Sequence, residues 1–123
     1  WLKRIYTEWN YDFTSNFTHN YPDPTIGVQR AFISTNIKRG ATFSNSMDYA
    51  NEKLDALFGK AARTPDGPAR NQTWAEIQAI LRNDLPVIFL MEISYTHVWN
   101  KRVHGLITNG VSMYSSWDSV WVD

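Results

Sequence analysis

The residues best suited to hold a ligand fall in a short loop, H-N-Y-P-D-P, which spans positions 19–24. This loop offers an imidazole at His19, an amide at Asn20 and a phenol at Tyr21. Each of its two prolines fixes its own φ angle and keeps the preceding residue out of the helical region, so the loop is expected to be stiff. Polar groups on a stiff loop can bind a solute by hydrogen bonds. The plainer interpretation is a Pro-Asp turn in which Asp23 caps its own turn or the helix that follows.

An alternating stretch, 11–18, leads into this loop. Aromatic or small residues occupy its odd positions and polar residues its even positions, which gives a period of two. That period and the many β-forming residues predict a β-strand. Because α/β proteins often bind ligands where a strand ends in a loop, we expect the strand to deliver Phe17 to a binding site beside the loop.

The composition argues against several other kinds of chemistry. The chain has 123 residues, no cysteine, and 12 basic against 12 acidic residues. Thiol catalysis and disulfides are therefore excluded, and the lack of a basic stripe argues against nucleic acid as a partner. The glycines form no phosphate-binding motif, and the three histidines lack the spacing of a zinc protease. We expect a protein that is not an enzyme and that uses no cofactor and no metal.

The elements that position the loop follow from hydrophobic periodicity. Apolar stripes predict helices over 51–62 and 69–82, and Asn51 is a suitable N-cap for the first. A continuous apolar run over 87–91 predicts a strand near 86–92 that is covered on both faces. Interleaved helices and strands indicate the α/β or the α+β class, but there are too few strands for a complete sheet. We therefore expect part of a larger protein, with exposed apolar surface through which this fragment self-associates.

Three further elements are expected from weaker signals. Apolar residues at helical spacing predict a helix over 1–10, and the polar, glycine-bearing stretch 36–48 predicts an exposed loop. The tail ends in Val-Trp-Val, positions 120–122, which predicts a closing strand.

A second function is suggested by the aromatic residues near the C-terminus. Trp99, Trp117 and Trp121 lie close together in sequence, and tryptophan rings on a surface can stack on sugars. This favours a stand-alone carbohydrate-binding or enzyme-associated module. Such modules are usually all-β, however, and two strong helices are predicted in the middle of this chain.

The order of the motifs resembles one known family. Y-D-F precedes N-Y-P-D-P, then come S-N-S-M-D-Y-A-N-E-K-L-D-A-L-F and R-x-x-x-W-x-E-I-Q-x-I-L-x-x-D-L-P-V-I-F-L, and V-W-N-K-R-V-H-G follows. This ordered set is similar to the C-terminal part of the family 5 extracellular solute-binding proteins, the peptide-type receptors of ABC importers. The resemblance covers nearly the whole chain.

The resemblance implies a fragment of a type II two-lobed periplasmic binding protein. Residues 1–92 would belong to the C-terminal ligand-binding lobe, while 93–123 would form the hinge crossing and a return segment of the N-terminal lobe. The implied function is to capture peptides or related small solutes between the lobes and pass them to the membrane permease. The implied location is the periplasm, or the outer face of the membrane through an anchor in a Gram-positive organism.

From the chemistry of the loop together with the resemblance, we expect Phe17, His19, Asn20 and Tyr21 to bind the ligand. In the family, the first acidic residue of a D-x-x-D-P motif pairs with the α-ammonium group of a peptide, and Asn20 occupies that position here. Because an amide both donates and accepts hydrogen bonds, Asn20 favours a neutral polar group or a blocked amine over an ammonium ion. Phe17 keeps the apolar wall that a tryptophan often provides, and His19 has no role in the family that carries over.

Overall fold

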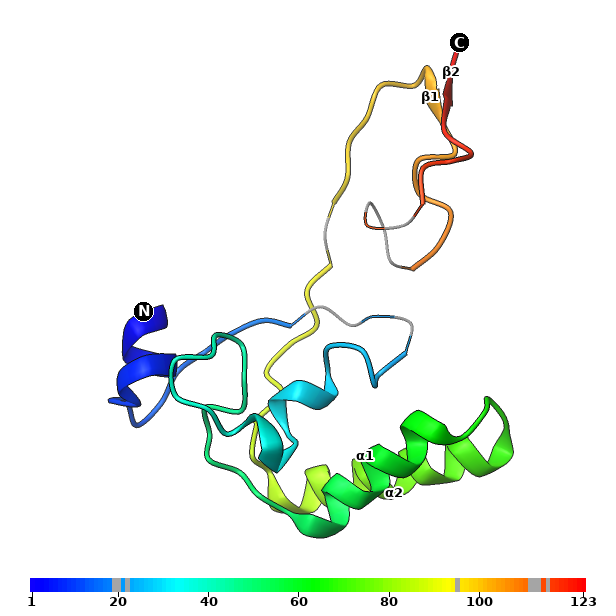
Figure 1. Cartoon of the computed structure of the whole chain (residues 1–123). Coiled ribbons are helices and arrows are strands. Elements are labelled where there is room, and N and C mark those ends of the chain that lie inside the picture. Colours follow the sequence, from blue (N-terminus) through cyan, green and yellow to red (C-terminus); the bar gives the residue numbers. More distant parts are fainter. Residues whose placement is uncertain (19–20, 22, 95, 111–113, 115) are drawn as a thin grey trace. The chain divides into compact units, whose positions relative to one another are not determined.

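The computed structural model describes residues 1–18, 21, 23–94, 96–110, 114 and 116–123 (Figure 1). The chain divides into two compact units, Trp1–Ile88 and Phe89–Asp123. In chain order the elements are η1 (Lys3–Glu8, a π-helix), η2 (Gln29–Ala31) and η3 (Ser34–Asn36), both 3-10 helices, α1 (Glu52–Arg63), α2 (Pro68–Asp84), β1 (Val103–His104) and β2 (Trp121–Val122). The assignment of 1–92 and 93–123 to two lobes stays a prediction.

The helix α1 confirms the prediction for 51–62. Asn51 has an extended backbone, and its side-chain oxygen accepts a hydrogen bond from the backbone N–H of Leu54 at 3.1 Å. This satisfies one of the N–H groups that have no partner in the first turn of a helix. The apolar stripe that predicted the helix is its buried face, which comprises Leu54, Leu57, Phe58 and Ala61.

The helix α2 confirms the prediction for 69–82 and extends it at both ends. Pro68 lies in the first turn of the helix. Backbone N–H groups in this turn form no hydrogen bond within the helix, so a residue without an N–H is tolerated there. The helix ends at Asp84, because Leu85 adopts the left-handed conformation and turns the chain away. The two α-helices lie side by side as a hairpin (Figure 1).

The core of the first unit lies where this hairpin meets the segments before it. Its buried members are Phe32, Leu54, Leu57, Phe58, Ala61 and Ile77. Trp74 packs against the core from α2, with its ring edge-on to Phe58 at 5.9 Å between centroids. The apolar stripe that predicted α1 therefore faces this core.

One residue of the loop over 36–48 corrects the expectation that this loop is exposed. Asn45 is fully buried. Its side-chain amide forms hydrogen bonds with backbone groups that find no partner in a helix or a sheet, so both the amide and these groups can be buried. Its Nδ2 donates to the carbonyl oxygens of Ile33 at 3.3 Å and Tyr49 at 2.7 Å. Its Oδ1 accepts a hydrogen bond from the N–H of Tyr49 at 3.3 Å. A polar residue thus holds the loop against the core.

The N-terminal helix is shorter than predicted. The expected helix over 1–10 is realised as η1, which buries Ile5 and Tyr6. Trp9 ends it in the left-handed conformation. Trp1 packs its ring edge-on against Tyr6, with 5.8 Å between the ring centroids.

The two predicted strands at 11–18 and 86–92 do not form, and these predictions are wrong. Neither stretch has regular secondary structure. A strand needs a neighbour for its N–H and C=O groups, and the pairing found among the described residues is between β1 and β2 alone. Without a partner, the first stretch is held by side chains instead. The Tyr11 hydroxyl, for example, donates to the carbonyl oxygen of Ser46 at 2.6 Å.

The apolar run is consequently exposed rather than covered. Ile88, Phe89, Leu90 and Met91 are all largely exposed to solvent. A run of this kind without a strand partner is a surface that other chains can cover. Self-association through it stays a prediction.

The second unit contains a short antiparallel pair. Val103 pairs with Val122, and His104 with Trp121, so the predicted closing strand is confirmed at β2. The Asp123 carbonyl oxygen also accepts a hydrogen bond from Arg102 Nε, which ties the tail to the turn before β1. Within the described part of the chain, none of the helices has the length and apolar content needed to cross a bilayer.

Candidate functional site

Asn16 holds the chain that enters the proline loop (residues 19–24). Its side-chain amide donates to the Tyr6 hydroxyl at 3.2 Å, and its Oδ1 accepts a hydrogen bond from the N–H of Phe17 at 2.8 Å. Burial raises the pKa of Tyr6, so this hydroxyl stays protonated at neutral pH. The Phe17 side chain is 58% exposed. The segment is therefore fixed to η1 while its aromatic residue presents surface to solvent.

Asp23 holds the other end of the loop. Its Oδ1 accepts hydrogen bonds from the N–H and the hydroxyl of Thr25, at 2.9 and 2.8 Å. This confirms the prediction that Asp23 caps its own turn. Its Oδ2 accepts a hydrogen bond from Arg70 Nη2 at 2.7 Å, across 47 positions of the sequence. The two carboxylate oxygens thus have different tasks, one in the turn and one in tertiary packing.

Arg70 projects from α2 and gathers three separate segments. Besides Asp23, its Nη1 donates to Asp66 Oδ1 at 2.6 Å and its Nε to the carbonyl oxygen of Ala61 at 2.9 Å. The guanidinium also lies 5.6 Å from the centroid of the Trp74 ring. Arg70 is only 9% exposed. A buried cation needs this degree of pairing to offset its loss of hydration.

The first prediction concerns acid. Hydrogen bonds from the Thr25 N–H and from Arg70 lower the pKa of Asp23 from 3.8 to about 2. A carboxyl group with a lowered folded-state pKa stabilises the fold above the unfolded pKa, and this contribution disappears as the pH falls through the folded value. The Asp23→Asn variant should therefore be less stable than wild type at neutral pH, and the gap should narrow between about pH 4 and pH 2. Urea midpoints of both proteins across this range measure the gap. A gap that is constant with pH would contradict the assignment.

Tyr21 is placed by a glycine that lies later in the chain. A Cβ atom built on Gly27 would stand 2.9 Å from Tyr21 Cδ2 and 3.1 Å from Cε2, closer than side chains tolerate. Gly27 also has a φ of 91°, which favours glycine. The absence of a side chain at this position thus lets the Tyr21 ring lie against the backbone. The tyrosine remains 48% exposed.

The structure describes two of the four predicted ligand-binding residues. Phe17 and Tyr21 are both exposed, and each stands next to a chain segment that polar contacts hold in place. His19 and Asn20 lie outside the described residues. The sequence did not predict that Arg70 holds the loop through Asp23. The signal that pointed to such a contact was the Asp23 carboxylate itself, because a partly buried carboxylate needs a cation beside it.

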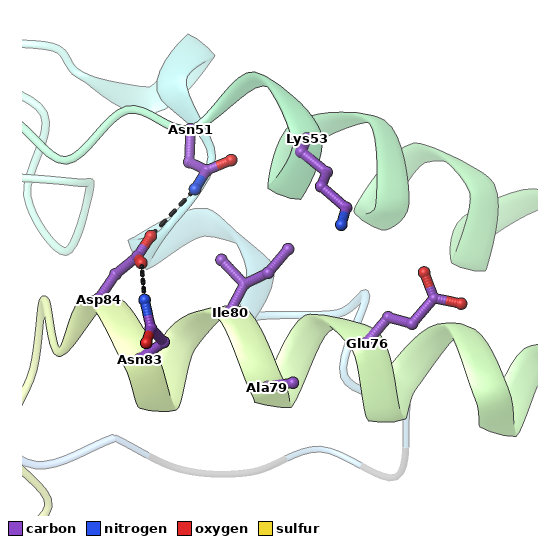
Figure 2. Close-up of a pocket in the computed structure, with 7 residues that line it drawn as sticks. All are labelled: Asn51, Lys53, Glu76, Ala79, Ile80, Asn83 and Asp84. Carbon is purple, nitrogen blue, oxygen red and sulfur yellow. Dashed lines mark hydrogen bonds between the residues drawn. The ribbon is translucent and has the colours of Figure 1, made fainter.

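A separate groove runs between the two α-helices (Figure 2). It has a volume of about 330 Å³ and is lined by Asn51, Lys53, Glu76, Ala79, Ile80, Asn83 and Asp84. Lys53 from α1 and Glu76 from α2 project into it, while Ile80 lies on its floor (Figure 2). The groove is shallow and open, and no sequence pattern predicted it.

Polar contacts at one end of this groove join the two helices. Asp84 Oδ2 accepts a hydrogen bond from the Tyr49 hydroxyl at 2.7 Å. It also accepts one from Asn51 Nδ2 at 2.9 Å, which is drawn in Figure 2. The Tyr49 contact is the main cause of the lowered pKa of Asp84. Burial, followed by the Asp84 carboxylate, raises the pKa of Tyr49 to about 12. These groups satisfy one another, which supports a structural role.

The aromatic cluster in the second unit is also partly engaged. The rings of His104 and Trp121 are stacked, with centroids 4.0 Å apart and planes 15° from parallel. His104 Nε2 lies 3.3 Å from Asp123 Oδ1. Trp99, Trp117 and Trp121 are exposed, but the stacked histidine covers a ring face that a sugar would use.

Among the residues that the structure describes, no three metal-ligating side chains lie together. Comparisons of the chain with models of protein families, with curated proteins and with solved structures found no match.

Proposed function

We propose that this chain is part of the substrate-binding component of an ABC importer, which captures peptides or related small solutes between two lobes. It would do so without catalysis and deliver its ligand to a membrane permease. It would act in the periplasm or, in a Gram-positive organism, anchored at the extracellular face of the membrane. The ordered motifs support the proposal. The helices α1 and α2 lie over the two longest of these motifs.

The observation that carries the proposal is that the proline loop is held at both ends. Asn16 fixes the entering chain to Tyr6, and Asp23 fixes the leaving chain to Arg70. A loop whose two ends are anchored loses less conformational entropy when a ligand binds. Phe17 and Tyr21 supply exposed aromatic surface on either side of the loop positions that we assign to the ligand. Aromatic walls with a few polar groups are typical of small-solute sites.

The properties of Asp23 agree with binding rather than acid–base catalysis. A carboxyl group with a pKa of about 2 is a poor proton acceptor and donor at neutral pH, when compared with the tuned groups of acid–base enzymes. Its oxygens are also occupied by Thr25 and Arg70. Asp23 therefore suits a structural role within a binding loop.

Native mass spectrometry of the intact protein, purified without denaturation, tests the proposed function. We expect a fraction of the protein to carry a small solute that is released on denaturation. The denatured sample is the control, because a covalent adduct would persist in it. A protein that carries nothing would count against solute capture, and a bound oligosaccharide would favour the carbohydrate-binding alternative.

A further inference from the structure

Arg70 is placed to act on the proline loop from a distance. Its guanidinium is fixed independently of the loop, because Nε donates to the Ala61 carbonyl oxygen at the end of α1 and the residue itself belongs to α2. The remaining contact, between Nη2 and Asp23 Oδ2 at 2.7 Å, reaches the segment that leaves the loop. The helical hairpin therefore serves as a rigid support for one end of the loop.

We infer that Arg70 is a positioning residue for the ligand site: it clamps Asp23 to the helical hairpin and so presets Tyr21, two positions earlier in the chain, for binding. This inference rests on the proposed function. Tyr21 precedes Asp23 by two positions, so it stays within about 7 Å of the anchored residue, since each residue spans at most ~3.6 Å. An anchor at Asp23 thus restricts the space that Tyr21 explores before a ligand arrives.

Gly27 provides a second support on the same side of the loop. It follows the turn that Asp23 caps, and its missing side chain leaves room for the Tyr21 ring. The clamp at Asp23 and the contact at Gly27 together fix both the direction of the chain and the orientation of one exposed aromatic residue. Tyr21 can then meet a ligand without first being ordered, which lowers the entropy cost of binding.

The inference is tested by two variants that remove one ion pair each from the same arginine. Asp23→Asn breaks the pair that holds the loop. Asp66→Asn breaks a pair of similar length, 2.6 against 2.7 Å, but Asp66 lies four positions before Arg70 and its side chain is 92% exposed. We expect Asp23→Asn to bind N-acetyl-trialanine about 2- to 10-fold more weakly than wild type, the effect of ordering one or two more groups on binding. Asp66→Asn should bind like wild type.

Hydrogen exchange of the same variants separates positioning from binding. The Thr25 N–H donates to the Asp23 side chain and the Ile26 N–H to its backbone carbonyl oxygen. Because both amides belong to the turn that Asp23 anchors, they should exchange faster in Asp23→Asn than in Asp66→Asn or wild type. Amides in the middle of α1 should not differ. If wild type binds neither free nor acetylated trialanine, the proposed function fails and the exchange data alone decide the positioning role. If wild type binds and both variants match it in affinity and exchange, the positioning role is refuted while the function stands.

A second matched pair tests the support at Gly27. Gly27→Ala and Gly40→Ala both place a side chain at a positive φ, 91° and 86°, and so share the same backbone strain. The Cβ at position 27 would meet Tyr21, whereas nothing lies within 4 Å of the Cβ at position 40. We expect a weaker affinity for N-acetyl-trialanine, again about 2- to 10-fold, in Gly27→Ala alone. Equal affinities in the two variants would show that Tyr21 is not positioned by Gly27.

Discussion

The Phe58→Ala variant of this chain should unfold with a free energy about 3–5 kcal/mol lower than wild type. Phe58 is 1% exposed and meets the edge of Trp74 across the hairpin. Truncation removes its buried apolar surface and leaves a cavity that two packed helices cannot close. Since small domains are stable by only about 5–15 kcal/mol, a large part of the stability of the first unit should be lost. Urea denaturation followed by far-ultraviolet circular dichroism measures the change.

Phe89→Ala is the matched control, because it makes the same substitution in a residue that is 82% exposed. We expect its unfolding free energy to stay within about 0.5 kcal/mol of wild type. If the two variants lose similar stability, then either the core is not centred on Phe58 or the apolar run around Phe89 is covered in solution.

The helical hairpin was predictable because its signals are local. Asn51 can cap only the helix that begins just after it, and Pro68 fits only a first turn. The apolar stripe of α1 repeats at helical spacing over the length of the helix, so one face had to be buried. Such features need no knowledge of the rest of the chain.

The two wrong strands show the limit of local signals. Alternation over 11–18 describes which side chains would share a face, but a strand exists only when another backbone pairs with it. The described residues contain no such partner for this stretch or for the run around Ile88. Sequence periodicity therefore indicated only a preference for an extended backbone. A strand would also have needed a neighbouring strand with which to form hydrogen bonds.

The candidate site was predictable only in part for a similar reason. That Asp23 would cap its turn follows from residues two positions apart, and the structure confirms it. Its ion pair with Arg70 spans 47 positions, and several other arginines were equally plausible partners in the sequence. The close approach of Gly27 to Tyr21 likewise depends on the turn between them, which fixes the path of the chain.

Asn20→Asp should change which ligands the intact protein prefers. A charge-assisted hydrogen bond contributes about 1.5–3 kcal/mol, compared with about 0.5–1.5 kcal/mol for a neutral one. Placing a carboxylate at this position should therefore raise the affinity for trialanine relative to N-acetyl-trialanine by about tenfold, which corresponds to about 1.4 kcal/mol. Calorimetric titration of both peptides gives the ratio of affinities.

Asn71→Asp is the matched control for this change, since it adds the same charge at an exposed position on α2, outside the proline loop. We expect it to leave the ratio of affinities unchanged. An equal shift in both variants would mean that net charge alters binding. The absence of a shift in Asn20→Asp would mean that Asn20 does not contact the ligand.

Titration of the intact wild-type protein with trialanine and N-acetyl-trialanine tests the proposed solute-binding function most directly. We expect saturable binding, with the acetylated peptide bound at least as tightly as the free one, because the amide of Asn20 offers no charge to an ammonium group. Binding of neither peptide, or a strong preference for the free amine in wild type, would contradict the proposed site.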